Sequence, residues 1–284
     1  MSFDSFTPRL KAVATGALVY CKRRYGGNGL KIEEGINKSI GWRPTFFLRP
    51  SRFLILAVEV DDNIYPEALK GAAHDIGHYD SPIAVYQACS LDAYQKDPKQ
   101  AKINLLRRHG FGIMTVDDDN SAIIQHSCIP LAQHISPDQL ETELGGLTST
   151  LKVKFRSAHE TYVTNAGQGL QQSGQLVEGL IQSIAGQSAK KGIIAVNVSK
   201  KDLADVIDAL YQTNEFKNHR AALGGARDFI KEFRNTASHA PKSAKQAADK
   251  FRKCKAGFLD GINVAKKLSL MARAMDFQVR IYTT

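Results

Sequence analysis

The sequence predicts an α+β protein of two domains: an N-terminal α/β domain with a mixed sheet, and a C-terminal all-α helical bundle. Short apolar runs typical of strands occur almost only in the first half of the 284 residues. In the second half, apolar residues recur at three- and four-residue steps, as in amphipathic helices. Residues 1–150 hold 16 Lys+Arg against 17 Asp+Glu, and residues 151–284 hold 22 against 11. The expected domains are residues 1–145 and 150–284.

The first elements of the N-terminal domain are a helix and a β-hairpin. Thr7 is suited to cap a helix whose first position is Pro8, and the glycine-rich segment 26–29 ends that helix. Residues 43–50 and 52–60 are two apolar runs joined by Pro-Ser. They predict a hairpin whose second strand is central and buried.

The next elements alternate between helix and strand. Residues 65–79 predict a helix with proline in its first turn, and residues 82–89 a strand. Residues 99–109 predict a short basic helix, and residues 111–116 another strand. This order is typical of an α/β domain with a mixed sheet.

Composition narrows the class of protein. No run of eighteen or more apolar residues occurs, which argues against a membrane span. The N-terminus lacks the basic-then-apolar pattern of a secretory signal. Four scattered cysteines without a CxxC pair favour reduced thiols over a zinc site or a disulfide framework. We therefore expect a cytoplasmic protein with no membrane association, no cofactor and no metal.

The second half predicts four or five amphipathic helices with short connections, which is typical of a bundle. The domain boundary is expected near residues 145–149. Residues 193–196 are expected to form a short extended piece or a buried turn. A capping box opens a helix over residues 199–210. The basic stretch 243–255 is expected to be separated from a last long helix by Gly257.

The most informative stretch is residues 226–241, an amphipathic helix that ends in polar residues. Arg234, Asn235 and His239 bring a cation, an amide and an imidazole together within six residues. Pro241 closes the stretch, because the residue before a proline is pushed out of the α region. Such a helix end suits phosphate chemistry. In the plainer alternative, His239 caps the helix and Arg234 forms a surface ion pair with Glu232 or Asp228.

The C-terminal half resembles a HEPN domain, a helical bundle that carries the motif Arg, four to six residues, then His, often with Asn after the Arg. Residues 234–239 fit this pattern with the Asn in place, and the last helix is similar to the corresponding helix of abortive-infection relatives. The resemblance implies a metal-independent endoribonuclease of the toxin or antiviral-defence type. Many bundles of this family instead bind nucleotides or dimerise without cleaving anything.

The spacing of the motif constrains the site. On a regular helix, five positions leave Arg234 and His239 about 140° apart, so they share a face only if the last turn opens or a second subunit contributes. HEPN ribonucleases resemble the second solution, which implies a homodimer with a composite site. His239 would be the general acid or base, Arg234 would stabilise phosphoryl charge, and Asn235 would orient one of them.

Basic residues after the motif predict an electrostatic track for RNA, although a solvated face would look the same. These residues are Lys242, Lys245, Lys250, Arg252, Lys253 and Lys255.

The N-terminal half resembles, by element order over residues 1–125, a restriction-endonuclease-like fold. Its family pattern implies an acid-x-Lys on the second hairpin strand, where this chain has Glu59-Val-Asp61. The implied metal site is therefore degenerate. A metal-dependent DNA nuclease at Glu59 and Asp61 is one alternative function, and a non-catalytic nucleic-acid-binding protein is another. The N-terminal domain is expected to sense a regulatory protein or nucleic acid.

Overall fold

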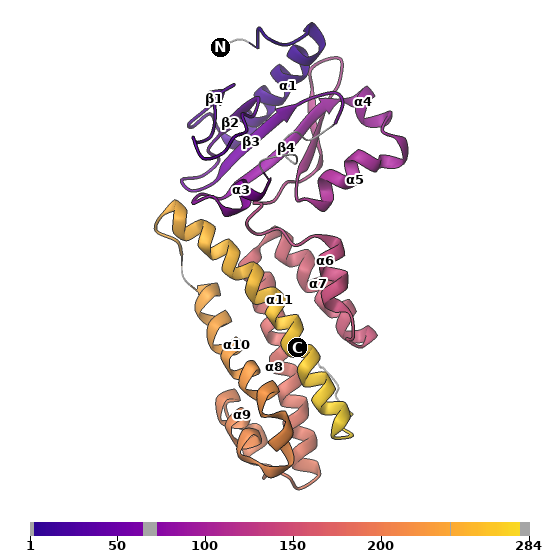
Figure 1. Ribbon diagram of the computed structural model, residues 1–284, viewed down its shortest axis with the longest axis vertical. Coiled ribbons are helices and arrows are strands. Elements are labelled where there is room, and N and C mark those ends of the chain that lie inside the picture. The colour runs from indigo at the N-terminus through magenta and orange to yellow at the C-terminus, as the bar shows by residue number, and fades with distance from the viewer. Residues whose placement is uncertain (1–2, 65–72, 239, 279–284) are drawn as a thin grey trace. The chain divides into compact units, whose positions relative to one another are not determined.

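The computed structural model describes residues 3–64, 73–238 and 240–278 (Figure 1). The chain divides into two compact units. Unit 1 comprises Met1–Asp138 and Pro241–Arg252, and unit 2 comprises Gln139–Ala240 and Lys253–Thr284. The described part is α+β, with a mixed sheet in unit 1 and helices in unit 2, which confirms the predicted fold class at this level.

A six-stranded mixed sheet forms the centre of unit 1, with its strands in sequence order. The second strand is antiparallel to both the first and the third. The third, fourth and fifth strands are parallel, and the sixth is antiparallel to the fifth. The predicted hairpin is present, with Phe47 opposite Ala57. The strands are β1 (Lys31–Ile32), β2 (Phe46–Leu48), β3 (Ile55–Val60), β4 (Ile83–Ser90), β5 (Gly112–Val116) and β6 (Ala122–His126).

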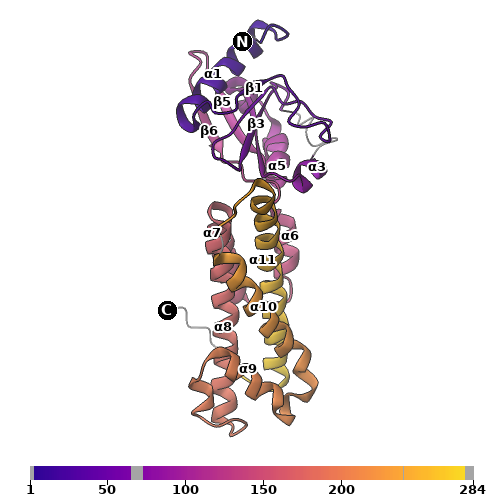
Figure 2. The ribbon, with the colours of Figure 1, turned by 90° about the vertical axis from the view of Figure 1, so that its left-hand side faces the viewer.

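Helices cover both faces of the sheet, which explains the continuous apolar runs of its central strands (Figures 1 and 2). All eight residues of β4 are buried. Helix α1 (Pro8–Tyr25) packs on one face through an alanine- and valine-rich stripe. Helices α3 (Ala73–His78) and α5 (Ala101–Arg108) pack on the other. Short helix α4 (Leu91–Gln95) follows β4 directly.

The predicted start and end of α1 are both present. The Thr7 hydroxyl accepts a hydrogen bond from the amide of Leu10, and Pro8 occupies the first helical position. Gly26 follows the helix with a φ of 79°, a conformation that side chains disfavour. Midway along the helix, Gly16 lets the chain approach Asn120, because a Cβ there would lie 2.6 Å from that carbonyl oxygen.

Two strands were not predicted. β1 has only two residues, which is too short for a periodic pattern to be recognised. β6 lies at the end of the strand order and is only partly buried, with Ile123 56% exposed. Its Ala-Ile-Ile segment directly follows the turn at residues 117–121. Of the helix expected over residues 65–79, residues 65–72 lie outside the described part.

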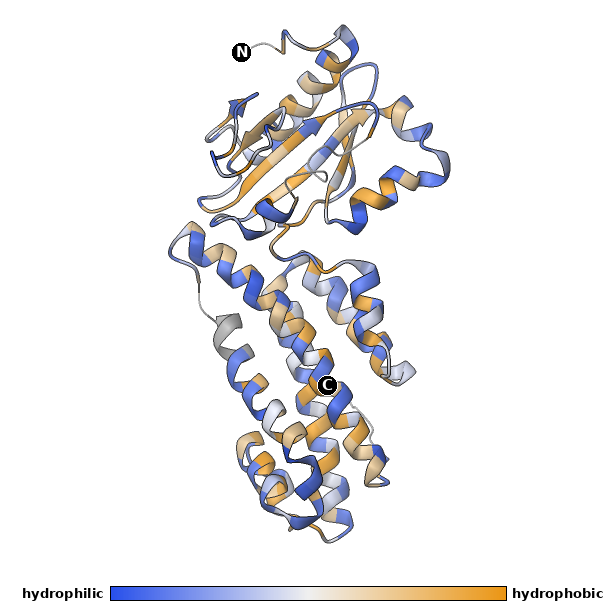
Figure 3. Cartoon of the chain, viewed as in Figure 1, coloured by the Kyte–Doolittle hydropathy of each residue, from blue (hydrophilic) through white to orange (hydrophobic). Residues whose placement is uncertain are grey.

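Unit 2 is helical throughout the residues described, and its apolar stripes face inward (Figure 3). Helix α8 contacts α7, α9 and α10, and α9 also contacts α10. The ring of Phe258 on α11 packs against Phe155 and Tyr162 of α7. The helices are α6 (Pro137–Leu144), α7 (Ser149–Thr164), α8 (Ala166–Lys190), α9 (Leu203–Gln212), α10 (Arg220–Ser238) and α11 (Ala244–Ala274).

Two local expectations were wrong. Gly257 does not separate two helices, because α11 runs without interruption from Ala244 to Ala274. Residues 193–196 form neither a strand nor a buried turn, and Val196 is 60% exposed. The boundary expected at residues 145–149 also differs from the division into units, whose first break follows Asp138.

Within the described ranges, no helix combines the length and apolarity needed to cross a bilayer.

Candidate functional site

The candidate site lies near the C-terminal end of α10, which carries Arg234 and Asn235 a few residues before its last residue, Ser238. The backbone is helical through Ser238. The side chains of residues 233–238 and the whole of His239 lie outside the described part of the structure. The positions of the three proposed catalytic groups relative to one another therefore stay a prediction.

The helical backbone nevertheless limits where the motif can change direction. Arg234 and Ser238 belong to one regular helix, so any opening that brings Arg234 and His239 to one side must begin after Ser238. Pro241 follows two residues after His239, and proline restricts the residue before it to extended backbone.

Packing against its neighbours fixes α10 along its length. Leu223 and Ala226 are fully buried, and Phe229 is 2% exposed. The Phe229 ring lies against α11, because a Cβ on Gly261 would be 3.0 Å from it. Burying a phenylalanine side chain contributes about 1.5–3 kcal/mol, so this contact holds the helix preceding the motif in a fixed rotation.

The basic residues that follow the motif divide into two groups. Lys242, Lys245 and Lys253 are exposed, as a track for RNA would require. Lys250, Arg252 and Lys255 are half-buried. A capping arrangement starts α11, in which the Ser243 hydroxyl accepts from the Gln246 amide at 3.2 Å. The sequence pattern grouped all six residues together, whereas burial separates them.

Arg252 has several partners inside unit 1. Its guanidinium donates to the carboxylate of Asp249 at 2.7 Å and to the carbonyl oxygens of Tyr79 at 2.5 Å and Gly77 at 3.4 Å. The two carbonyls lie at the end of α3, where unpaired acceptors favour a cation. These bonds leave Arg252 fewer donors for a phosphate than the exposed lysines have.

Two of the lysines also differ in their electrostatic setting. The ammonium group of Lys245 lies 3.7 Å from the carboxylate of Asp80, an exposed pair that contributes little stability. Burial lowers the pKa of Lys255, because the charged ammonium loses hydration. Lys242 and Lys253 are thus the members of the set best suited to contact a phosphate backbone.

Glu59 and Asp61, the two acids of the alternative metal-dependent function, occupy the end of β3 and the turn that follows it. Glu59 lies on β3 opposite Gln87 and is half-buried. The Asp61 carboxylate accepts the amide of Asn63 at 2.8 Å, so it shapes the turn that follows the strand. In the part of the chain that the structure describes, no group of three His, Cys, Asp or Glu residues is arranged to hold a metal ion.

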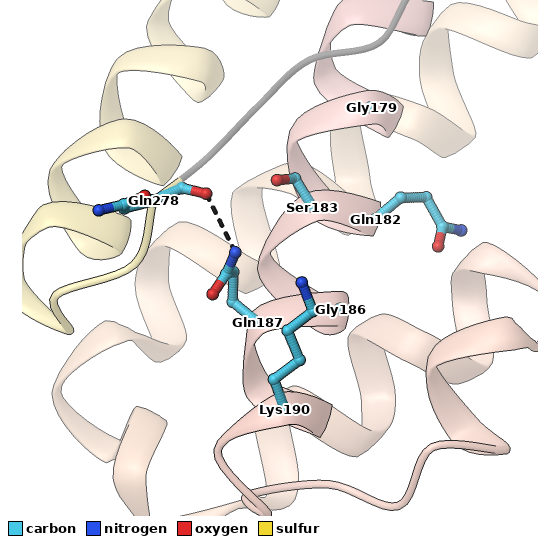
Figure 4. Close-up of a pocket in the computed structure, with 7 residues that line it drawn as sticks. All are labelled: Gly179, Gln182, Ser183, Gly186, Gln187, Lys190 and Gln278. Atoms are coloured by element: carbon cyan, nitrogen blue, oxygen red, sulfur yellow. Dashed lines mark hydrogen bonds between the residues drawn. The ribbon is translucent and has the colours of Figure 1, made fainter.

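A groove of about 620 Å³ lies along α8 in unit 2 (Figure 4). The Gln187 side-chain amide donates to the carbonyl oxygen of Gln278 at 3.2 Å. Among the residues that the structure describes, the lining contains one charged side chain and no imidazole or carboxylate. The lining residues are Gly179, Gln182, Ser183, Gly186, Gln187, Lys190 and Gln278.

Comparisons with protein-family models, with curated proteins and with solved structures found no match.

Sequence reasoning did not single out a polar cavity at the ends of β3 and β4, which Arg9, Asp62, Asp92 and Lys102 help to line. These residues are far apart in the chain. The only signal in the sequence was the acidic residues that follow consecutive strands.

Proposed function

We propose that the protein is a metal-independent endoribonuclease of the HEPN type, whose site is built from Arg234, Asn235 and His239. The observation that carries the proposal is that Arg234 and Asn235 lie close to the C-terminal end of a helix in a helical unit. His239 and Pro241 follow that helix, and the exposed lysines of α11 come next.

The proposed reaction uses the RNA's own 2′-hydroxyl as nucleophile. A bond forms from the 2′-oxygen to phosphorus while the bond from phosphorus to the 5′-oxygen breaks, which leaves a 2′,3′-cyclic phosphate and a 5′-hydroxyl. His239 accepts the proton of the 2′-hydroxyl or supplies one to the departing 5′-oxygen, since an unperturbed imidazole titrates near pH 6.5. Arg234 offers a fork of donors to the phosphoryl oxygens, and Asn235 orients the histidine or the phosphate.

The protein would act as a homodimer. Two motifs facing each other across a two-fold axis supply two histidines, one as base and one as acid. Lys242 and Lys253 would contact the RNA backbone. Unit 1 would then sense the regulatory protein or nucleic acid that controls cleavage, in a toxin or antiviral-defence setting inside the cell.

A digestion of single-stranded RNA in EDTA tests this function. Wild-type protein is expected to cleave RNA to products ending in a 2′,3′-cyclic phosphate and to leave DNA of the same sequence intact. His239→Ala is expected to lower the rate by at least about 100-fold, as loss of a general acid or base does. His219→Ala, which changes another histidine of unit 2, is the matched control.

Three outcomes would contradict the proposal. Full activity of His239→Ala would show that the motif is not catalytic. Cleavage that requires magnesium and is lost in Glu59→Gln would favour the metal-dependent DNA nuclease. Absence of cleavage by wild-type protein that still binds RNA would favour the non-catalytic binding protein.

A further inference from the structure

A small cavity in unit 1, of about 270 Å³, lies at the ends of two parallel strands. β3 ends at Val60 and β4 at Ser90, and the cavity is lined by residues that follow both strands, among them Asp62 and Asp92. Parallel strands bring their carboxyl ends to the same edge of a sheet, and open α/β sheets bind their ligands outside that edge. Arg9 reaches the cavity from the first turn of α1.

Among the described lining residues, the carboxylates of Asp62 and Asp92 are paired with cations, and that of Asp97 accepts the backbone amides of Lys102 and Ile103. Arg9 Nε lies 2.7 Å from Asp62 Oδ2, and Arg9 Nη2 lies 3.0 Å from Asp92 Oδ2. The ammonium group of Lys96 lies 2.8 Å from Asp92. The second oxygen of Asp62 accepts the amide of Ser90 at 2.8 Å. These contacts occupy the acceptors that would otherwise attract a cation.

Hydrogen-bond donors, in contrast, are left over. Among the described residues, the Nη1 group of Arg9 has no hydrogen-bond partner. The ammonium group of Lys102 donates to the carbonyl oxygen of Asn63 at 2.6 Å and has no carboxylate within 4 Å in that part of the chain. A lysine offers three donors and an arginine five, so the cavity presents more donors than the protein uses.

The backbone around the cavity is strained. Ile64, which lines it, has a φ of 48°, a conformation that a β-branched residue rarely adopts. Lys99 and Gln100, next to the lining residue Pro98, have φ values of 55° and 54°. Such residues persist where the surrounding structure holds them, and they are frequent at ligand sites.

We propose that this cavity binds the phosphate group of a small phosphorylated molecule. Phosphate oxygens accept several hydrogen bonds, and the unused Nη1 group of Arg9 and the ammonium groups of Lys96 and Lys102 can donate to them. The volume corresponds to roughly nine waters of liquid, at about 30 Å³ each, which suits a phosphomonoester and is small for a dinucleotide. The site is independent of the proposed RNA-cleaving motif.

Calorimetric titration of the full-length protein tests this site with three probes: inorganic phosphate, a nucleoside 5′-monophosphate and the nucleoside alone. The two phosphate-bearing probes are expected to bind with Kd values of about 1 mM or tighter, and the nucleoside is expected not to bind. Tighter binding of the monophosphate would identify a phosphomonoester as the ligand. Equal binding would identify free phosphate.

Lys102→Met is expected to weaken phosphate binding at least about tenfold, because a hydrogen bond from a charged donor is lost. Lys22→Met, on the exposed side of α1, is the matched control and should bind as wild type does. Lys96→Met is the second variant if Lys102→Met unfolds at lower temperature. Absence of saturable phosphate binding by wild type, or unchanged binding in both cavity variants, would overturn the proposal.

Discussion

At the scale of single residues, His159 is a half-buried titratable group in an aromatic environment. Its Nε2 atom is closed off from solvent and has no hydrogen-bond partner among the residues that the structure describes. The ring stacks on Tyr162 and meets the edge of Phe258, with ring centroids 5.8 Å apart in both pairs. Burial lowers the pKa of His159, and the nearby Glu160 partly opposes this shift. The fold therefore favours the neutral imidazole.

This environment predicts that stability depends on pH. The unfolded chain binds a proton at His159 near pH 6.5, whereas the folded protein does so only at lower pH. The free energy of unfolding should therefore be highest above pH 6.5 and fall as pH drops below it. Urea unfolding at several pH values measures the effect, which should be smaller in His159→Phe.

The matched control is His219→Ala, which changes a histidine outside this aromatic cluster. It should keep the wild-type pH dependence. If His159→Phe and the wild type lost equal stability between pH 7.5 and pH 5.5, roughly one unit on either side of the ordinary histidine pKa, His159 would not be the group responsible.

At the scale of elements, glycines determine how closely the helices of unit 2 approach one another. A Cβ on Gly257 would lie 3.1 Å from the Leu170 side chain, and one on Gly261 would overlap the Ser173 hydroxyl. A glycine inside a helix costs about 1 kcal/mol relative to alanine, and the packing of α8 against α11 offsets that cost. In the sequence, Gly257 looks like a break between two helices.

Two glycines of α8 should respond oppositely to alanine. A Cβ on Gly169 would overlap the backbone of Tyr162, so Gly169→Ala should destabilise the protein by about 1–3 kcal/mol. A Cβ on Gly186 would have no atom of the described residues within 4 Å, so Gly186→Ala should stabilise the protein by up to about 1 kcal/mol. Urea unfolding measures the change in the free energy of unfolding for both variants. Changes of the same sign would contradict the packing described.

At the scale of the whole molecule, charge and fold are divided unevenly along the chain. The excess of basic residues lies beyond residue 150, and the exposed lysines that follow the motif lie at the start of α11. A polyanion bound there would release condensed counterions. This charge distribution favours RNA as a partner. The other expected partner is a second copy of the chain, because the proposed site needs two motifs.

RNA binding by His239→Ala protein, which should bind without cleaving, is therefore expected to weaken steeply with salt. Plotted against the logarithm of the salt concentration, the logarithm of the RNA association constant falls with a steepness set by the number of phosphate contacts. Lys242→Ala and Lys253→Ala should each make this decline shallower by about 0.7 for single-stranded RNA. Arg252→Ala should have a smaller effect, because its guanidinium is bonded to Asp249 and to two carbonyls. Equal effects of all three substitutions would contradict this division of the basic residues.

The sequence determined much of the fold through local signals. Thr7 and Pro8 predicted the start of α1, and the apolar run that becomes β3 predicted a buried central strand. Such signals are readable because capping and periodicity depend only on neighbouring residues. The candidate motif at Arg234 and His239 was also found by spacing alone, and its catalytic role stays a prediction.

Tertiary structure decided what depends on residues far apart in the chain. It joined Arg9 to Asp62 and Asp92, because parallel strands end at one edge of the sheet. Helix α11 continues without a break at Gly257, where the contact with Leu170 favours a small residue. Tertiary structure also bound Arg252 to backbone carbonyls near residue 79. No local pattern encodes these contacts, since each depends on how distant segments pack.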